Sequence, residues 1–164
     1  MNYLGIDPGK TGGIAVVSED GGLISLIACG DIEATTVDRL KEAALLKPVK
    51  AYIERVASFP GQGVSSTFTF GVRYGLIRGV LATLGIPFVD IPPQTWQKTL
   101  GLSQPKQSAK DLTPSEKTSR RNARRKQQKA LAYQMARQLY PNDSRITLEN
   151  ADGVLLAECC KRSR

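Results

Sequence analysis

The chain has 164 residues, 41% of them hydrophobic, and a formal net charge of +8, with three cysteines and no histidine. A chain of this length can bury a core without disulfide bonds, so we expect a single folding unit over residues 1–164. The cysteines fit neither a disulfide framework nor a zinc site, and no apolar run or signal-peptide pattern indicates a membrane span or secretion; we therefore expect a soluble, cytoplasmic protein with reduced core thiols.

The first part of the chain is rich in short apolar runs. Runs at residues 3–6, 13–17 and 23–28 are separated by turns that contain glycine or proline, which predicts three strands in an antiparallel meander. Apolar residues at helical spacing then predict a helix from Thr35 to near Pro48.

Two further strands alternate with helices. The pattern predicts a strand over residues 51–56, a long helix over 66–84 and a short strand over 87–91. Strands that are joined through helical crossovers run parallel. The order therefore predicts an α/β protein whose five-stranded mixed sheet has three antiparallel and then two parallel strands, flanked by helices.

The long helix carries Gly71, Gly75 and Gly79 at intervals of four, so they share one stripe of its surface. Each glycine costs a helix roughly 1 kcal/mol relative to alanine, which indicates that something approaches the backbone closely. Close packing on the sheet is the favoured interpretation. A subunit contact, which Phe68 and Tyr74 would support, is the alternative.

The positive charge is concentrated in one stretch. After a short amphipathic helix at 95–100, residues 103–129 carry nine Lys and Arg against two acids, and the rest of the chain is near neutral. Such a patch favours a polyanion such as nucleic acid, although a solvated or disordered segment is about equally consistent with the charge alone. We expect a mobile basic loop over about 103–119 and a helix over 120–140.

Acidic residues stand at the ends of three predicted elements. A last helix over 148–161 would place Glu149 and Asp152 on one face of its first turn, where acids are often ordinary caps. Asp7 and Glu54, however, lie on a pair of strands expected to be parallel, near ends that share one sheet edge. A buried carboxylate cluster is costly unless it binds cations, and oxygen ligands favour magnesium or manganese.

Three short motifs accompany this order of elements: the turn Ile6-Asp7-Pro8-Gly9, the pair Ile53-Glu54 and the terminal Glu149-Asn150-Ala151-Asp152. Together they resemble the RuvC Holliday-junction resolvases of the RNase H-like superfamily, over nearly the whole chain. The resemblance implies an endonuclease that hydrolyses phosphodiester bonds with two Mg²⁺ ions per active site, for which Mn²⁺ substitutes, leaving 5′-phosphate and 3′-hydroxyl ends.

The resemblance also implies a role for each acid. Asp7 would bridge the two metal ions, Glu54 and Asp152 would each bind one, and Glu149 would complete the cluster. Family members commonly have aspartate or histidine at the position of Glu149, whose extra methylene would shift its carboxylate. Such chemistry needs neither a histidine base nor a covalent nucleophile.

DNA-contacting residues follow from the same resemblance. It places Lys98 and Lys126 near the scissile phosphate, and Phe59 where an aromatic ring could stack on an unpaired junction base. Phe68 is the competing aromatic residue, and core packing is the commoner role for either. The basic residues expected at DNA are Lys98, Arg120, Arg121, Arg124, Arg125 and Lys126, although any one of them could equally be a solvated surface charge.

The implied substrate is branched DNA. A four-way junction has near two-fold symmetry, so paired incisions imply a homodimer, with the long helix as its interface. Recognition would then depend on DNA shape and phosphate positions more than on base edges.

Three other functions stay open. A broader branch, fork or flap endonuclease would share every catalytic residue. A sugar-kinase or actin-like nucleotide-binding module also begins with a strand that ends in Asp-x-Gly-x-Thr, although 164 residues are few for two lobes. A non-catalytic nucleic-acid-binding protein would use the acids only as helix caps.

Overall fold

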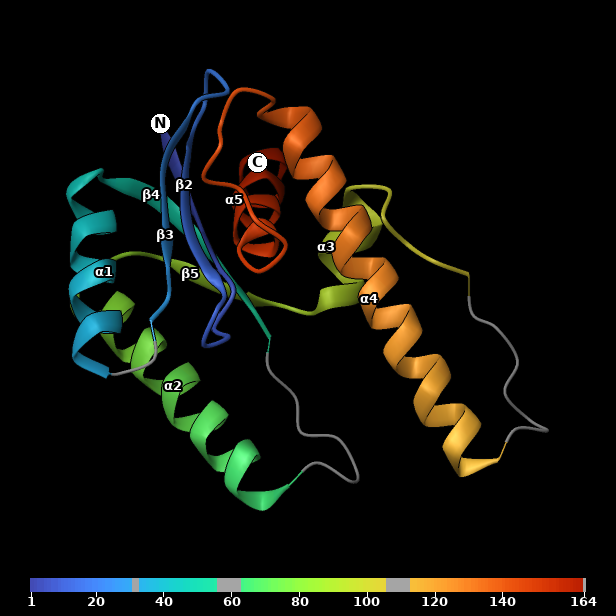
Figure 1. Cartoon of the computed structure of the whole chain (residues 1–164). Coiled ribbons are helices and arrows are strands. Elements are labelled where there is room, and N and C mark those ends of the chain that lie inside the picture. Colours follow the sequence, from blue (N-terminus) through green and yellow to red (C-terminus); the bar gives the residue numbers. More distant parts are fainter. Residues whose placement is uncertain (31–32, 56–62, 106–112, 164) are drawn as a thin grey trace.

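A computed structural model describes residues 1–30, 33–55, 63–105 and 113–163. Its centre is one five-stranded sheet with the strand order β3-β2-β1-β4-β5 (Figure 1). The first three strands pair antiparallel, and β1, β4 and β5 pair parallel, which confirms the predicted mixed sheet. The strands are β1 (Asn2–Ile6), β2 (Gly13–Ser18), β3 (Leu23–Ala28), β4 (Pro48–Glu54) and β5 (Phe88–Ile91).

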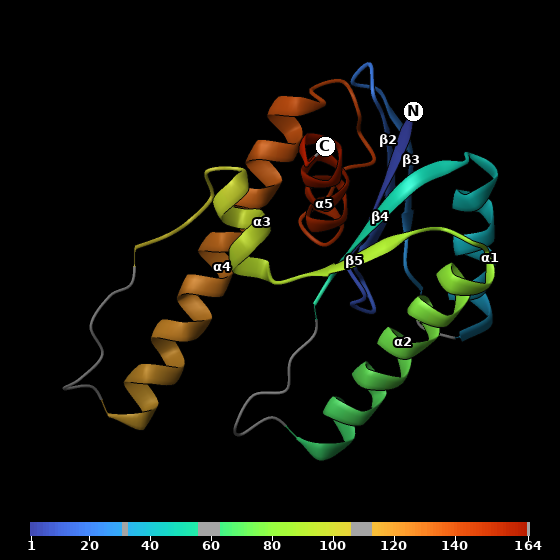
Figure 2. The same ribbon diagram turned by 180° about the vertical axis from the view of Figure 1, so that it is seen from behind.

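Helices cover both faces of the sheet, as the views from front and back show (Figures 1 and 2). The first two helices pack on one face, and the last three lie on the other. Alternate residues of a strand point to opposite faces, so Leu4 and Ile6 join the first layer and Tyr3 the second. The helices are α1 (Glu33–Leu45), α2 (Val64–Thr83), α3 (Pro93–Thr99), α4 (Pro114–Leu139) and α5 (Ala151–Arg162).

The helix α5 lies directly on the backbone of the sheet. A Cβ atom at Gly5 in β1 would be 2.1 Å from the backbone nitrogen of Ala157, and one at Gly153 would be 2.4 Å from the carbonyl oxygen of Gly13. No side chain larger than hydrogen fits at these two glycines. This close approach carries the start of α5 to the edge where β1 ends.

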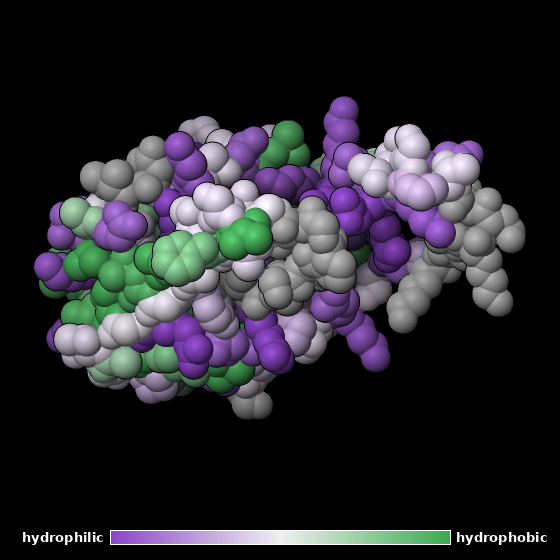
Figure 3. Space-filling model, turned by 90° about the horizontal axis from the view of Figure 1, so that it is seen from below, coloured by the Kyte–Doolittle hydropathy of each residue, from purple (hydrophilic) through white to green (hydrophobic). Residues whose placement is uncertain are grey.

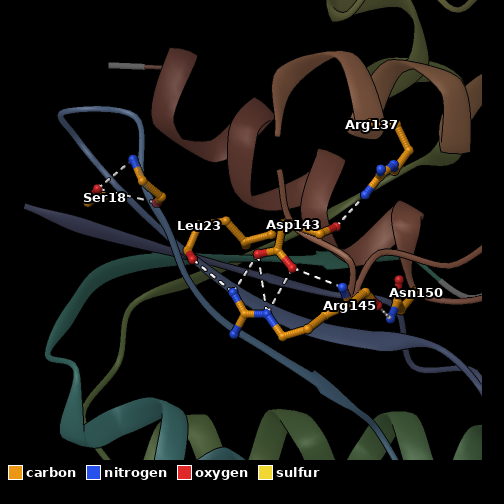
Figure 4. Close-up of polar contacts among 7 residues, drawn as sticks. Ser18, Leu23, Arg137, Asp143, Arg145 and Asn150 are labelled. Atoms are coloured by element: carbon orange, nitrogen blue, oxygen red, sulfur yellow. Dashed lines mark hydrogen bonds and ion pairs between the residues drawn. The ribbon is translucent and has the colours of Figure 1, made fainter. Parts of the chain in front are cut away.

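A polar cluster ties the connection between α4 and α5 to the sheet (Figure 4). The guanidinium of Arg145 bonds to the Asp143 carboxylate and donates to the carbonyl oxygen of Leu23, at 3.1 Å, at the start of β3. The amide of Asn150 donates to the Arg145 carbonyl oxygen at 3.0 Å. Through Arg145, the turn before α5 is therefore linked to β3 on one side and to Asn150 on the other.

The helix α5 begins three residues later than predicted. Asn150 is its N-cap, and the turn before it closes through two bonds: the Asn150 side-chain oxygen accepts from the Thr147 backbone nitrogen at 2.8 Å, and the Thr147 hydroxyl accepts from the Asn150 nitrogen at 3.4 Å. The expected position of Glu149 in the first helical turn is therefore wrong. It lies in the preceding turn, whereas Asp152 lies in the first turn.

The helix α4 begins earlier than predicted, so the expected loop over 103–119 is wrong for residues 114–119. Thr113 and Glu116 form a capping box: the Glu116 nitrogen donates to the Thr113 hydroxyl at 3.3 Å, and the Thr113 nitrogen donates to the Glu116 carboxylate at 2.8 Å. Pro114, which has no N–H to satisfy, occupies the first helical position. Residues 106–112 lie outside the described part of the chain.

The interpretation that the glycine stripe of α2 packs on the sheet is also wrong. A Cβ atom at Gly71, Gly75 or Gly79 would meet no atom of the described residues within 4 Å. The stripe faces outward, beside exposed Val64 and Phe68. The subunit contact stays a prediction.

Two expectations about the chain as a whole can be compared with the structure. The three cysteines are buried and free, which confirms that they are core thiols. Across the described residues, no helix combines the length and the apolar character that a membrane span needs.

Candidate active site at the carboxyl edge of the sheet

Three of the predicted carboxylates come together where the parallel strands end. Asp7 follows β1, Glu54 is the last residue of β4, and Asp152 lies in the first turn of α5. The register of the two strands pairs Ile6 with Ile53, so Asp7 and Glu54 are also neighbours. Because α5 packs on β1, its first turn brings Asp152 to the same edge.

The three side chains share one electrostatic environment. Burial, followed by the negative charges of Asp7 and Asp152, raises the pKa of Glu54 to about 8. Burial and the charge of Asp7 raise the pKa of Asp152 to about 7, and burial also raises the pKa of Asp7. The protein therefore holds acids where it disfavours their ionised forms, and a nearby cation would relieve that cost.

Neighbouring groups orient two of the carboxylates. The backbone nitrogen of Gly9 donates to Asp7 Oδ1 at 3.0 Å, and a Cβ atom at Gly12 would lie 2.7 Å from the Asp7 side-chain carbon. The indole nitrogen of Trp96 donates to Glu54 Oε1 at 3.3 Å. Trp96 is completely buried, so it holds Glu54 from a rigid position that the sequence did not reveal.

Lys129 is a second site residue that the sequence analysis missed. Its positive charge lowers the pKa of Asp7, Glu54 and Asp152 alike, against the stronger effect of burial. Helical spacing could have identified it, because Lys129 lies three and seven residues before Ala132 and Ala136, which are buried in the core. Lys129 is itself exposed, one turn before the buried stripe of α4.

The basic residues predicted at the scissile phosphate have a different placement. Lys98 lies exposed in the last turn of α3, and Lys126 lies exposed on α4, three residues before Lys129. Their contact with DNA stays a prediction, and Lys129 is the α4 residue whose charge acts on all three carboxylates. Phe59 lies outside the described residues, and its competitor Phe68 is 74% exposed on α2.

Glu149 does not share the environment of these three half-buried carboxylates. It is exposed in the turn before α5. Among the described residues, no three His, Cys, Asp or Glu side chains are placed so that they could hold one metal ion as they stand. The fit to a divalent cation therefore rests on the donor type, three carboxylates, and on their raised pKa values.

Glu158 shows how a structural acid differs. It is buried deeper in α5, where it accepts hydrogen bonds from the Tyr140 hydroxyl and from Lys161, whose nitrogen is 2.7 Å away. A lysine thus neutralises this carboxylate directly. The three carboxylates at the sheet edge instead share the charge of Lys129.

Two long helices flank the acidic edge. Both α2 and α4 extend past the ends of the parallel strands, on opposite sides of them (Figures 1 and 2). From below, hydrophobic side chains gather on the side of α2 and hydrophilic ones on the side of α4 (Figure 3). The predicted basic residues on α4 are all exposed: Arg120, Arg121, Arg124, Arg125 and Lys126.

The strand order and the helices on both faces define an RNase H-like fold of the RuvC type. The structure of Thermus thermophilus RuvC is similar with a TM-score of 0.59 and 16% identity, over 97% of this chain and 92% of that chain. T. thermophilus RuvC in complex with Holliday junction substrate is similar with a TM-score of 0.63 and 16% identity, over 97% and 91%. A search of protein-family models finds no match, and neither does a search of curated proteins. The predicted resemblance is confirmed at the level of the fold.

Proposed function

We propose that this protein is a divalent-metal-dependent endonuclease that cuts branched DNA, and that its substrate is the four-way (Holliday) junction. The observation that carries the proposal is the group of half-buried, electrostatically coupled carboxylates Asp7, Glu54 and Asp152 at the sheet edge, beside the basic helix α4. The similarity to RuvC supports it, because one of the similar structures holds Holliday junction substrate.

The proposed cofactor is Mg²⁺, two ions per site, with Mn²⁺ as a substitute. Asp7, Glu54 and Asp152 would hold the ions, and Glu149 is proposed as the fourth ligand. Bound Mg²⁺ activates water and stabilises the leaving oxygen in phosphodiester hydrolysis, which leaves a 5′-phosphate and a 3′-hydroxyl.

The chain's own residues prepare the site for an anionic substrate. The Gly9 amide orients Asp7, and the Trp96 indole orients Glu54. The ammonium of Lys129 places a positive charge beside them and would contact the scissile phosphate. The predicted basic residues of α4 and Lys98 would contact the DNA backbone.

The proposed assembly is a homodimer formed through α2. The outward face of this helix combines three glycines with exposed Val64, Phe68 and Val72. Glycine lets two helices approach closely, and exposed apolar side chains are characteristic of subunit contacts. A two-fold dimer would present one active site to each of two opposed strands of a junction.

The remaining candidates differ in what they require. A branch, fork or flap endonuclease would use the same site and is separated only by its substrates. The two-lobed nucleotide-binding module is disfavoured, because the described residues form one sheet. A role of the acids as mere caps is disfavoured for Asp7 and Glu54, which lie at strand ends.

The test is cleavage of a labelled four-way junction, a replication fork and a linear duplex, in Mg²⁺ and in EDTA. We expect symmetric metal-dependent nicks at the junction, which Asp7→Asn abolishes while junction binding persists. Asp38→Asn, which removes an exposed acid from α1, is the matched control and should cut normally. Equal cutting of fork and junction would favour the broader nuclease, and binding without cutting by the wild type would refute the catalytic proposal.

A further inference from the structure

A second basic site lies on α4, away from the carboxylates. A pocket of about 450 Å³ opens between the segment that follows α3 and the first half of α4. Four cationic side chains line it, together with two glutamines, a proline and an alanine. The lining residues are Lys117, Arg120, Arg121, Arg124, Gln104, Gln127, Pro105 and Ala123.

The pocket and the active site lie on different sides of the helix. Lys129 is on the stripe of α4 that reaches the carboxylates. Arg124 precedes it by five residues, which places it about 140° away around the helix axis. Arg124 donates to the Gln104 carbonyl oxygen at 3.1 Å, and Gln128 donates to that of Leu102 at 3.2 Å, so this side of α4 faces the segment after α3. A ligand in the pocket is therefore not the scissile phosphate.

The pocket is suited to an anion. Lys117 and Arg121 are four residues apart, so their like charges repel on adjacent turns. The single acid of α4, Glu116, is held by the capping box with Thr113. A negatively charged ligand would remove this repulsion.

Gln104 lies in the pocket wall beside these cations. Its side-chain nitrogen is buried and has no hydrogen-bond partner among the described residues. Arginine guanidinium groups bind phosphate oxygens through paired hydrogen bonds, and three of the four cations here are arginines. The chemistry of the wall therefore matches phosphate groups.

We propose that this pocket binds backbone phosphates of a second arm of the branched DNA, so that α4 lies between two arms. One arm occupies the carboxylate site on one side of the helix, and the other is held at the pocket. Arms that diverge from a branch point can pass on both sides of a helix, whereas a straight duplex cannot. The proposal rests on the proposed function, which supplies its substrate. It gives the proposed nuclease a physical source of selectivity for branched over linear DNA.

The test compares two doubly substituted full-length proteins of equal charge. Lys117→Gln/Arg121→Gln removes two cations from the pocket, and Lys41→Gln/Lys47→Gln removes two exposed cations from α1 and the turn after it. Binding to a four-way junction and to a linear duplex is measured in EDTA at several salt concentrations. Circular dichroism and thermal melting check that both variants are folded.

We expect the pocket variant to lose junction affinity by at least 10-fold, and its salt slope for the junction to become smaller by about 1–2, as the loss of two phosphate contacts requires. Its affinity for linear duplex should change by less than about 3-fold, because a duplex would use only one side of the helix. The control variant should match the wild type on both substrates.

Two results would overturn the proposal. Equal losses on junction and duplex would make the pocket a general cationic surface, and losses no greater than those of the control would mean that no DNA arm binds there. Pyrophosphate, added at constant ionic strength, tests whether the pocket binds free polyphosphate. If it shifts the melting temperature of the wild type but not that of the pocket variant, and the variant still binds DNA normally, the pocket would be assigned to free polyphosphate instead. Cutting of the junction by the wild type in Mg²⁺ is scored separately, so a failure of the proposed nuclease activity is distinguishable from a failure of the pocket.

Discussion

Gly5 shows how a single residue positions the active site. Its missing side chain lets α5 rest on β1, and that contact brings Asp152 to the end of the strand that Asp7 follows. The neighbouring atoms are backbone atoms of Gly153 and Ala157, which cannot rotate away. A methyl group at this position would therefore push the helix off the sheet.

We predict that Gly5→Ala destabilises the fold by about 3 kcal/mol, at the upper end of the usual cost of overpacking a core. Urea unfolding at equilibrium measures this loss. Gly75→Ala is the matched control: its methyl group would point into open space on α2, and it should stabilise the monomer by roughly 0.4–1 kcal/mol. Equal stabilities of the two variants would contradict the described contact between α5 and β1.

Lys129 yields a second prediction at the residue scale. If its ammonium contacts the scissile phosphate, Lys129→Gln should lower the single-turnover cutting rate by roughly 100-fold. The reason is that the variant loses a positive charge beside the negative charge that develops in the transition state. Junction binding should persist. Lys98→Gln, which removes an exposed lysine of α3, should have a much smaller effect, and a larger effect of Lys98→Gln would restore the original assignment.

The two projecting helices carry opposite kinds of surface. In the first half of α4, Glu116 is the only acid among seven charged side chains, and of the cations only Lys117 lies near the first turn, where a positive charge opposes the helix dipole by a few tenths of a kcal/mol. The capping box of Thr113 and Glu116 stabilises the same helix start by about 1 kcal/mol. The face of α2 instead combines glycine with apolar side chains and has no partner within the described chain.

We predict that α2 is the dimer contact and that Gly75→Arg produces a folded monomer, because a long charged side chain would separate the two helices. Analytical ultracentrifugation measures the mass, and the junction assay should then show single nicks in place of paired ones. Glu42→Arg, on the exposed surface of α1, is the control and should leave the dimer intact. A wild-type protein that sediments as a monomer would refute the proposed assembly.

At the scale of the whole molecule, the half-buried acids at the sheet edge link stability to pH. Glu54 has its pKa raised from 4.5 to about 8, and Asp152 from 3.8 to about 7, so the folded protein holds more protons than the unfolded chain between these values. Stability must therefore fall as the pH rises through this window. The fold is therefore most stable, relative to the unfolded chain, when these two carboxyl groups are protonated.

We predict that the metal-free protein loses a few kcal/mol of unfolding free energy between pH 5 and pH 8. Urea unfolding in EDTA at several pH values measures the loss. Asp7→Asn should flatten the dependence by removing one of the repelling charges, whereas Asp38→Asn should not. A stability that stays level or rises over this range would show that the carboxylates are not buried together.

Much of the fold followed from local patterns. Alternating apolar runs and Gly-Pro turns predicted the five strands, and the crossovers predicted which of them run parallel. That order placed Asp7 and Glu54 at one edge, because the ends of parallel strands must meet there. The early start of α4 could also have been predicted from Thr113 and Glu116, which form a capping pattern. The proline- and polar-rich composition around them instead indicated a loop.

By itself, then, the amino-acid sequence determined the type and order of the elements and the edge at which two carboxylates meet, since these depend on neighbours along the chain. Tertiary structure alone decided which face each helix presents: that the glycines of α2 point outward, that Lys129 reaches the acids and that Trp96 holds Glu54. It also decided that Glu149 lies exposed, apart from the three half-buried carboxylates. The physical reason is that the rotation of a helix about its own axis is set by contacts between residues far apart in sequence, which local periodicity does not specify.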